Sequence, residues 1–320
     1  NSYNDLPKIY NQWSNVVRWE TTTNPFLRST EFLWQEGHTS HSNAEEAIQF
    51  TEDMIQTYQK FYKDYLALDV ICGKKTEKEK FAGADTTWTI EAMMKDGRAL
   101  QAATSHYLGQ NFSKMFDVSF KDQSNKLVNV YQTSWGLSTR SIGAIIMSHG
   151  DNRGIVMPPR IAPIKVILIE VLAKKKEKVK EISKQILELL QNNNISSKID
   201  NSNKSVGFKA SQSEIEGIPI RIEIGPKEIE KNEVLVIRRD TLEKYPVQIS
   251  NILMFVNNLL EEIHNNLYKN SQKRLKDNLV YCNSYEEFKK LIKQQKFVVV
   301  PIVKDSFKWE EKIKEETLAT

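Results

Sequence analysis

The chain has 320 residues, of which 40% are hydrophobic and 27% charged, with few glycines and prolines. This mixture is typical of a globular protein with two or three domains. No apolar run approaches the roughly 20 residues of a membrane-spanning helix, and Cys72 and Cys282 are too few for a disulfide framework or a cysteine-rich zinc site. We therefore expect a protein of the reducing cytoplasm that does not span a membrane.

Positive charge is concentrated in the second half of the sequence. The net charge is +4; residues from Ile161 onward carry 28 basic and 23 acidic side chains, and the residues before it carry 17 and 18. A solvated charged surface would give this distribution, and so would a polyanion-binding part that follows a near-neutral catalytic part. Composition alone leaves both interpretations open.

The first half predicts an antiparallel sheet flanked by helices. Residues 8–20 and 26–37, joined by the polar turn TTTNP, predict a β-hairpin. Residues 99–109 and 126–138 predict further strands, and the amphipathic pattern over 44–69 predicts a long helix. Residues 138–151 then change from a loop into an apolar helix. These elements predict an α+β fold and not a doubly wound parallel sheet.

The second half predicts a mixed α/β arrangement after a proline-rich linker at 154–163. The predicted elements are a strand buried on both faces at 164–172, an amphipathic helix at 174–193, strands at 196–200, 218–226 (half-exposed) and 233–240, and a long helix at 250–277. Residues from 278 onward predict a last strand–helix–strand unit.

Two stretches of the predicted hairpin carry candidate phosphate-binding groups. In VVRWE, strand alternation places Arg18 and Glu20 on one face. Such an arginine is most often part of a cross-strand ion pair, and it can alternatively present its planar fork to a phosphate. Arg28 precedes the return strand, and Phe32 offers a ring on which a base can stack. Alternation there places Glu31 and Leu33 opposite Phe32 and Trp34.

The return strand also contains His38 and His41, whose spacing first suggests a metal site. Zinc needs further ligands, and no cysteine, aspartate or third histidine is nearby in the sequence. We therefore reject a metal site here.

Two later stretches contain polar groups within apolar runs. Gln101, Thr104 and His106 must find hydrogen-bond partners, either as satisfied core residues or as the lining of a small pocket. Gly136 would permit a close backbone approach, and Arg140 begins a helix where it can contact an adenine or a phosphate. The sequence contains no P-loop, GxGxxG or GxSxG motif.

Taken in order, these stretches resemble the class II aminoacyl-tRNA synthetases, and specifically the prolyl-tRNA synthetase family. VVRWE resembles the second motif of that class, FLRSTEFLWQEGHTSH its return strand, and SWGLSTRSIGAIIMSHGD the third motif. The segment from KTEKEKF to QNFSKMF is similar to the proline-specific middle region. IPIRIEIGP and VIRRD resemble the anticodon-binding unit less specifically.

The resemblance implies a domain organisation of the archaeal and eukaryotic type, without an editing insert. It places a class II catalytic core at 1–160, an anticodon-binding α/β domain at 161–277 and a small C-terminal α/β unit at 278–320. The first motif and the ligands of the proline amine would lie before Asn1. Relatives usually carry a cysteine zinc site in the C-terminal unit, which is doubtful here because Cys282 has no partner cysteine nearby.

The resemblance also implies ATP-dependent activation of L-proline and its transfer to tRNA(Pro), with Mg²⁺ accompanying ATP and a homodimer as the expected assembly. Arg18 and Arg140 would be the catalytic residues, with Phe32 and Arg140 on either side of the adenine. The expected ATP contacts are Arg18, Glu20, Arg28, Glu31, Phe32, Gln101, Thr104 and Arg140, and the expected proline contacts are Arg18, Trp34, His106 and Ser138.

Two alternative functions stay open at this stage. The chain could serve another small amino acid, such as threonine or alanine, or it could be a non-catalytic tRNA-binding relative. Arg238 and Arg239 end a predicted strand and could reach tRNA phosphates or base edges. Both arginines could equally pair with Asp240 and nearby glutamates.

Overall fold

The computed structural model describes residues 2–171, 177–302 and 307–319. They form two compact units. The first unit comprises Asn1–Lys63, Asp69–Ala144 and Gln272–Thr320, and the second comprises Asp64–Leu68 and Ile145–Ser271. This division falls at different residues from the sequence-based boundaries after 160 and 277, and it groups the C-terminal residues with the first unit.

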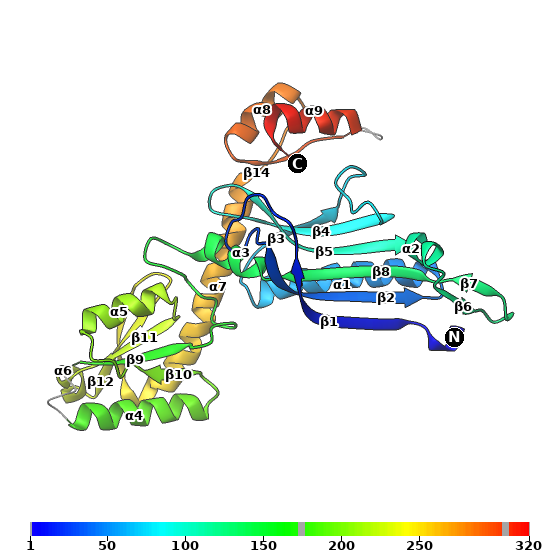
Figure 1. Ribbon diagram of the computed structural model, residues 1–320. Coiled ribbons are helices and arrows are strands. Elements are labelled where there is room, and N and C mark those ends of the chain that lie inside the picture. Colours follow the sequence, from blue (N-terminus) through cyan, green and yellow to red (C-terminus); the bar gives the residue numbers. More distant parts are fainter. Residues whose placement is uncertain (1, 172–176, 303–306, 320) are drawn as a thin grey trace. The chain divides into compact units, whose positions relative to one another are not determined.

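The first unit is built on a six-stranded antiparallel sheet with the order β1-β2-β8-β5-β4-β3 (Figure 1). Its strands are β1 (Lys8–Val17), β2 (Glu31–His41), β3 (Val70–Lys74), β4 (Thr86–Met93), β5 (Ala99–Gly109) and β8 (Tyr131–Ser138). The short strands β6 (Ser119–Lys121) and β7 (Leu127–Asn129) form a separate hairpin, preceded by α2 (Asn111–Met115). The predicted α+β class and the β1–β2 hairpin are confirmed.

Helix α1 (Ala44–Asp64) covers one face of this sheet. Its apolar stripe buries Ile55 and Tyr62, as the amphipathic pattern predicts. The Tyr58 hydroxyl donates a 2.5 Å hydrogen bond to Gln35 Oε1, and Ser105 Oγ donates a 2.8 Å bond to the carbonyl of Thr51. Because neighbouring residues of a strand alternate between faces, Trp34 and Glu36 lie on the face away from α1.

The second unit contains a mixed sheet with the order β10-β9-β11-β12-β13. Its strands are β9 (Val166–Glu170), β10 (Ser197–Ile199), β11 (Ile220–Ile224), β12 (Glu233–Arg238) and β13 (Lys244–Gln248). Its helices include α4 (Glu177–Asn192), α5 (Val206–Ile215) and α6 (Pro226–Glu230). Helices α3 (Arg140–His149) and α7 (Ile252–Asn278) have residues in both units, as does α1 through its last residue, Asp64. The predicted start of α4 at 174–176 lies outside the described residues.

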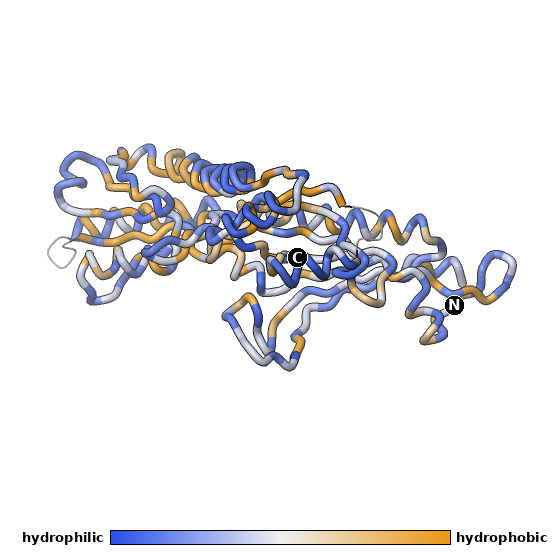
Figure 2. The backbone as a smooth tube through the Cα atoms, turned by 90° about the horizontal axis from the view of Figure 1, so that it is seen from above, coloured by the Kyte–Doolittle hydropathy of each residue, from blue (hydrophilic) through white to orange (hydrophobic). Residues whose placement is uncertain are grey.

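The sheet of the second unit has a continuous aliphatic core. Ile220, Ile222 and Ile224 of β11 are fully buried, and Figure 2 shows hydrophobic residues gathered on these strands at the left of the view. The prediction that β11 is half-exposed is wrong, because β11 lies between β9 and β12 and is covered on both faces. Even Arg221 is buried there, paired with Glu214 and Glu223.

The C-terminal residues form β14 (Leu279–Tyr281), α8 (Tyr285–Lys293) and β15 (Phe297–Val299), which confirms the predicted strand–helix–strand order. A further helix, α9 (Phe307–Thr317), was not predicted. The 3₁₀ helices η1 (Tyr3–Asp5) and η3 (Ile249–Asn251) complete the elements named here. Within the described residues, none of the helices combines the length and the apolar character that crossing a bilayer requires.

Candidate functional site

A cavity of about 470 Å³ lies on the sheet face of the first unit that is opposite α1. Strands β2, β5 and β8, the β1–β2 turn and the start of α3 supply its walls. Ten of the eleven residues expected to contact ATP or proline line it, namely Arg18, Glu20, Arg28, Phe32, Trp34, Gln101, Thr104, His106, Ser138 and Arg140. Residues up to 122 positions apart in sequence therefore meet at one site, from Arg18 to Arg140.

Positive charge and an aromatic ring meet at the end of the β1–β2 hairpin. The main-chain nitrogen of Arg18 donates a 2.7 Å hydrogen bond to Thr30, which fixes the arginine just after β1. Its guanidinium carbon lies 5.1 Å from the centre of the Phe32 ring, within cation–π range. Arg28 Nη1 lies 3.6 Å from Glu20, and the Arg28 side chain is 64% exposed. Arg28 can therefore leave this weak ion pair for a stronger anion.

Arg140 is held much more firmly, at the first turn of α3. Its Nε donates a 3.0 Å bond to the carbonyl of Leu27, and its Nη1 a 3.4 Å bond to the carbonyl of Gln101. Burial lowers the pKa of Arg140 from its ordinary value, and the neighbouring Arg28 lowers it further. Two carbonyl acceptors thus hold a desolvated cation at the cavity without neutralising its charge.

His106 is a neutral polar group at the other end of the cavity. Its Nδ1 lies 2.9 Å from Thr87 Oγ1, and Phe81 packs against the imidazole with ring centres 5.3 Å apart. Burial lowers the pKa of His106 to about 4, so the ring is neutral near pH 7. Trp34 also lines the cavity; its ring lies edge-on to Phe32 with centres 5.9 Å apart, and its Nε1 donates a 3.0 Å bond to Ser14. The neutral imidazole and the Phe81 ring can therefore form one wall of a site for a small ligand.

Glu31 does not line the cavity, although it was expected to contact the nucleotide. Asn15 Nδ2 donates a 2.5 Å hydrogen bond to Glu31 Oε1 on the opposite face of the hairpin. The exposed Leu33 and Val17 lie on that face as well. Because neighbouring residues of a strand alternate between faces, the Glu31 side chain lies on the face away from the cavity and does not reach the expected nucleotide site.

Gly136 lines the cavity, but the close backbone approach expected there is not required. A Cβ atom on Gly136 would lie 3.4 Å from the carbonyl oxygen of Gln35, an ordinary contact. Gly37 is the residue whose missing side chain matters, because an added Cβ would collide with the Trp135 ring. Trp135 pairs with Gly37 across β8 and β2, and it lines the cavity.

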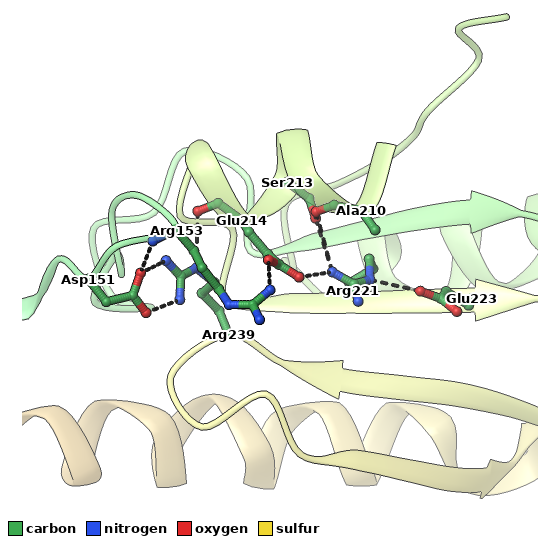
Figure 3. Close-up of polar contacts among 8 residues, drawn as sticks. All are labelled: Asp151, Arg153, Ala210, Ser213, Glu214, Arg221, Glu223 and Arg239. Carbon is green, nitrogen blue, oxygen red and sulfur yellow. Dashed lines mark hydrogen bonds and ion pairs between the residues drawn. The ribbon is translucent and has the colours of Figure 1, made fainter. Parts of the chain in front are cut away.

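Arg238 and Arg239, the expected tRNA contacts, are buried in the second unit. Arg239 donates two 2.7 Å bonds to the carboxylate of Asp151 and a 3.0 Å bond to the carbonyl of Glu214 (Figure 3). Arg238 forms a similar two-bond pair with Asp240 at 2.7 and 2.8 Å. The side chains are 9% and 2% exposed for Arg238 and Arg239. Arg238 thus has the internal partner that the sequence left open, Asp240, whereas the carboxylate that pairs with Arg239 is the distant Asp151 and not Asp240 or a nearby glutamate.

His38 and His41 lie on opposite faces of β2. His38 Nε2 is 3.2 Å from Glu36, whereas the fully buried His41 contacts Thr39 through Nε2 at 2.8 Å and lies 3.3 Å from Glu46 through Nδ1. Burial lowers the pKa of His41. Across the described part of the chain, no group of three or more His, Cys, Asp or Glu side chains is placed to hold a metal ion.

The sequence analysis assigned no role to several residues that line the cavity. Four of them, Lys75, Glu79, Lys80 and Phe81, come from the segment after β3, and Thr87 follows on β4. Their sequence signals were a charged run, which is more often a solvated surface, and the resemblance of KTEKEKF to the proline-specific region, and neither singled out individual residues. These residues reach the cavity because the folded chain places the segment after β3 beside it.

The comparisons with known proteins agree with this geometry. Residues 1–149 match the family model of the tRNA synthetase class II core domain (G, H, P, S and T), and residues 165–259 match that of the anticodon binding domain. Proline–tRNA ligase of Mycoplasmopsis synoviae is 60% identical over 320 residues, which are all of this chain and 66% of that protein. The ligase of Mycoplasmopsis pulmonis is 56% identical over 319 residues, 67% of its length.

This chain belongs to the proline–tRNA ligase family. A solved prolyl-tRNA synthetase from Cryptosporidium parvum, complexed with L-proline and AMP, superimposes with a TM-score of 0.95 at 42% identity, covering 99% of this chain and 69% of that one. A second structure of that synthetase, complexed with halofuginone and AMPPNP, gives the same score and identity. The chain spans about two thirds of the length of the family members it matches.

Proposed function

We propose that the protein activates L-proline with ATP and transfers the prolyl group to tRNA(Pro). The observation that carries this proposal is the two-ended cavity. One end gathers Arg18, Arg28, Phe32 and Arg140, which suit a nucleotide, and the other presents the neutral His106 packed against Phe81. Trp34 lines the same cavity. Family membership supports the same assignment, since the matched relatives are proline–tRNA ligases.

The proposed chemistry needs positioning and charge stabilisation but no protein nucleophile. A carboxylate oxygen of proline attacks the α-phosphorus of ATP, and the bond to pyrophosphate breaks. Arg18 binds the α-phosphate, Arg28 the outer phosphates, and Arg140 packs on the adenine opposite Phe32. Fixed cations in a partly desolvated cavity stabilise the charge that develops in the transition state. The terminal hydroxyl of tRNA then attacks the prolyl carbonyl carbon, and AMP leaves.

Mg²⁺ is expected to accompany ATP. The Glu20 carboxylate lines the cavity with a side chain 22% exposed, next to the arginines that would hold the phosphates. One such carboxylate fits an ion that is bound mainly by phosphate oxygens and water. When bound, the ion would neutralise part of the pyrophosphate charge.

The tRNA contacts proposed from sequence have to be reassigned, because Arg238 and Arg239 are buried. In the second unit, Phe208 is 51% exposed near the start of α5, and the Lys204 ammonium lies 5.4 Å from the ring centre. An exposed ring beside a cation can stack on an unpaired base and contact its phosphate. We therefore place part of the anticodon contact at Phe208 and Lys204.

The proposed setting is the cytoplasm, and the proposed assembly is a homodimer. β1 is an edge strand of the sheet, and its Tyr10 and Trp13 are 67% and 81% exposed. Large exposed apolar groups at a sheet edge are typical of surfaces that become covered on association.

The test is proline-dependent exchange of labelled pyrophosphate into ATP by the full-length protein. Proline should support exchange, and alanine should support it weakly, because an apolar pocket discriminates by only about 1–3 kcal/mol per methylene. A preference for threonine over proline would contradict the proposal, and so would the absence of exchange with every amino acid.

A further inference from the structure

The C-terminal helix α9 contacts the segment that follows β3. Four of its residues, Phe307, Glu310, Glu311 and Lys314, recur at the spacing that places side chains on one helical face. Each of the four contacts a residue of 76–79. Residues 75–81, here called the 75–81 loop, include four of the cavity-lining residues described above.

The contacts alternate in charge along the loop. Thr76 Oγ1 donates a 2.6 Å hydrogen bond to Glu310, and Lys78 lies 3.5 Å from the carboxylate of Glu311. The Lys78 ammonium also lies 5.0 Å from the Phe307 ring centre, and Lys314 lies 3.6 Å from Glu79. A cation of the loop thus meets an acid of the helix, and an acid of the loop meets a cation. This complementarity selects one register between helix and loop.

A second face of α9 is fixed to α8. The Trp309 ring packs edge-on against Tyr285 with centres 5.8 Å apart, and the Tyr285 hydroxyl donates a 3.0 Å bond to Glu316. The Lys312 ammonium lies 5.2 Å from the Tyr285 ring centre. In Figure 2, the helix beside the C label is mostly hydrophilic, which agrees with attachment through polar contacts and a few aromatic rings.

The opposite side of the loop belongs to the amino-acid end of the cavity. Lys75 pairs with Glu91 of β4 at 2.8 Å, and Phe81 packs against His106. The main-chain nitrogen of Phe81 donates a 3.1 Å bond to Thr87 Oγ1, the same hydroxyl that contacts His106. A shift of the loop would therefore move Phe81 and disturb the imidazole.

We propose that α9 holds the 75–81 loop in its ligand-binding conformation, so that Glu310, Glu311 and Lys314 act as positioning residues for the amino-acid end of the cavity. The loop belongs to no helix or strand, and ordering such a segment costs conformational entropy. Contacts that order it before the ligand arrives remove this cost from binding. The expected effect on the Michaelis constant for proline rests on the proposed function, whereas the effect on loop order does not.

The experiment compares two variants of the full-length protein. Glu310→Ala/Glu311→Gln removes both acidic contacts of α9 with the loop, because alanine cannot accept the Thr76 hydrogen bond and glutamine carries no charge to pair with Lys78. Glu315→Gln removes one acid of the same helix that makes no ion pair within the described residues. Amide hydrogen exchange of residues 75–81 is measured by mass spectrometry without ligands. Proline-dependent and ATP-dependent pyrophosphate exchange are then measured for each variant.

The double variant should exchange its loop amides faster and raise the Michaelis constant for proline about fivefold, as two contacts of this exposed type allow. The Michaelis constant for ATP and the melting temperature should stay near the unaltered values, as should all properties of the Glu315→Gln control. Glu311→Lys alone should accelerate the amide exchange of the loop. Adding Lys78→Glu, which reverses the ion pair, should restore slow exchange.

Unchanged loop amide exchange in the double variant would overturn the proposal. Faster loop exchange with an unchanged Michaelis constant for proline would also overturn it, because the loop would then not control binding. If the unaltered protein showed no proline-dependent activity, the proposed function would fail, and amide exchange would still decide whether α9 orders the loop.

Discussion

Arg140 illustrates how main-chain acceptors prepare a cationic side chain for a ligand. A carboxylate partner would neutralise the guanidinium, whereas the carbonyls of Leu27 and Gln101 orient it through two nitrogens and leave its charge available. The guanidinium has five N–H donors, so it can make these two hydrogen bonds while its planar face remains free to stack on an adenine. Lysine offers a point charge and no planar face, so it cannot replace this arrangement.

Arg140→Lys should therefore reduce proline-dependent pyrophosphate exchange about 10- to 30-fold, the scale of losing a desolvated cation–π stack of roughly 2 kcal/mol. The matched control is Arg98→Lys, because Arg98 is 62% exposed and its carboxylate partner is Asp96. The control should keep its rate within about twofold, since exposed ion pairs contribute little. A similar loss in both variants would show that the fork of Arg140 has no special role.

Most residues of the site could be predicted from sequence because strand alternation and the motif spacings are local. Arg18, Phe32 and Trp34 face the cavity as their positions on the hairpin require. Glu31 does not, and the same alternation already indicated this. Arg239 could not be placed from sequence, because its partner Asp151 is 88 residues away. Lys75 and Phe81 needed the tertiary structure for the same reason.

Strand β2 and its neighbour β8 meet so closely that one position accepts only glycine. Trp135 lies over Gly37, and any Cβ there would displace the ring. Gly37→Ala should lower the free energy of unfolding by about 1–3 kcal/mol, as overpacking does. Gly73 of β3 has no atom within 4 Å of an added Cβ, so Gly73→Ala should be neutral or slightly stabilising. Urea unfolding of both variants measures the difference, and equal stability would contradict the steric argument.

The elements that sequence patterns did not predict have weak or misleading signals. The segment VGFKASQSEI forms α5 although it contains Gly207 and few apolar residues on one face. β13 contains Pro246, which disfavours a strand in general but is tolerated here because β13 is at the edge of its sheet. Long amphipathic segments such as α1 and α4 were predictable because periodicity over many residues needs no tertiary information.

Within the second unit, the ion pair between Asp151, just after α3, and Arg239, just after β12, should respond to acid. The Arg239 hydrogen bonds lower the pKa of Asp151 to about 2 from its ordinary 3.8. Because the folded-state pKa is the lower one, the pair contributes its full stability above about pH 4 and loses it as pH falls towards 2. At pH 7, Arg239→Ala should cost about 2 kcal/mol, less than a fully buried pair, because Asp151 is 39% exposed.

Chemical unfolding of Asp151→Asn and of the unaltered protein between pH 7 and pH 3 tests this pH dependence. The stability difference between them should be largest at neutral pH and should shrink below about pH 4, because the unfolded chain then takes up a proton at Asp151 that the folded protein binds only near pH 2. A difference that stays constant across this range would mean that Asp151 has no depressed pKa. Asp122→Asn, in the β6–β7 turn of the first unit, is a control for loss of an aspartate elsewhere.

At the scale of the whole molecule, the proposed activation chemistry and the proposed anticodon contact belong to different units. Phe208→Ala should raise the Michaelis constant for tRNA about tenfold, since base stacking on a ring is worth roughly 1–3 kcal/mol. Pyrophosphate exchange without tRNA should be unchanged. Aminoacylation kinetics over a range of tRNA concentrations measures the first quantity. Unchanged tRNA kinetics would remove Phe208 from the contact surface, and loss of both activities would indicate misfolding.

The second unit is assembled from two separate lengths of chain. Asp64–Leu68 belongs to it, with Ala67 and Leu68 fully buried, His149 Nε2 2.9 Å from the carbonyl of Leu66, and Arg160 donating to the carbonyl of Asp64. A fragment cut at the apparent boundary after residue 160 would lack these five residues and also Asp151, leaving Arg239 as an uncompensated buried charge. Such a fragment is poorly suited to being grafted onto another enzyme. Transplantation that preserved the fold would have to begin near residue 145 and supply a substitute for the short segment at the end of α1.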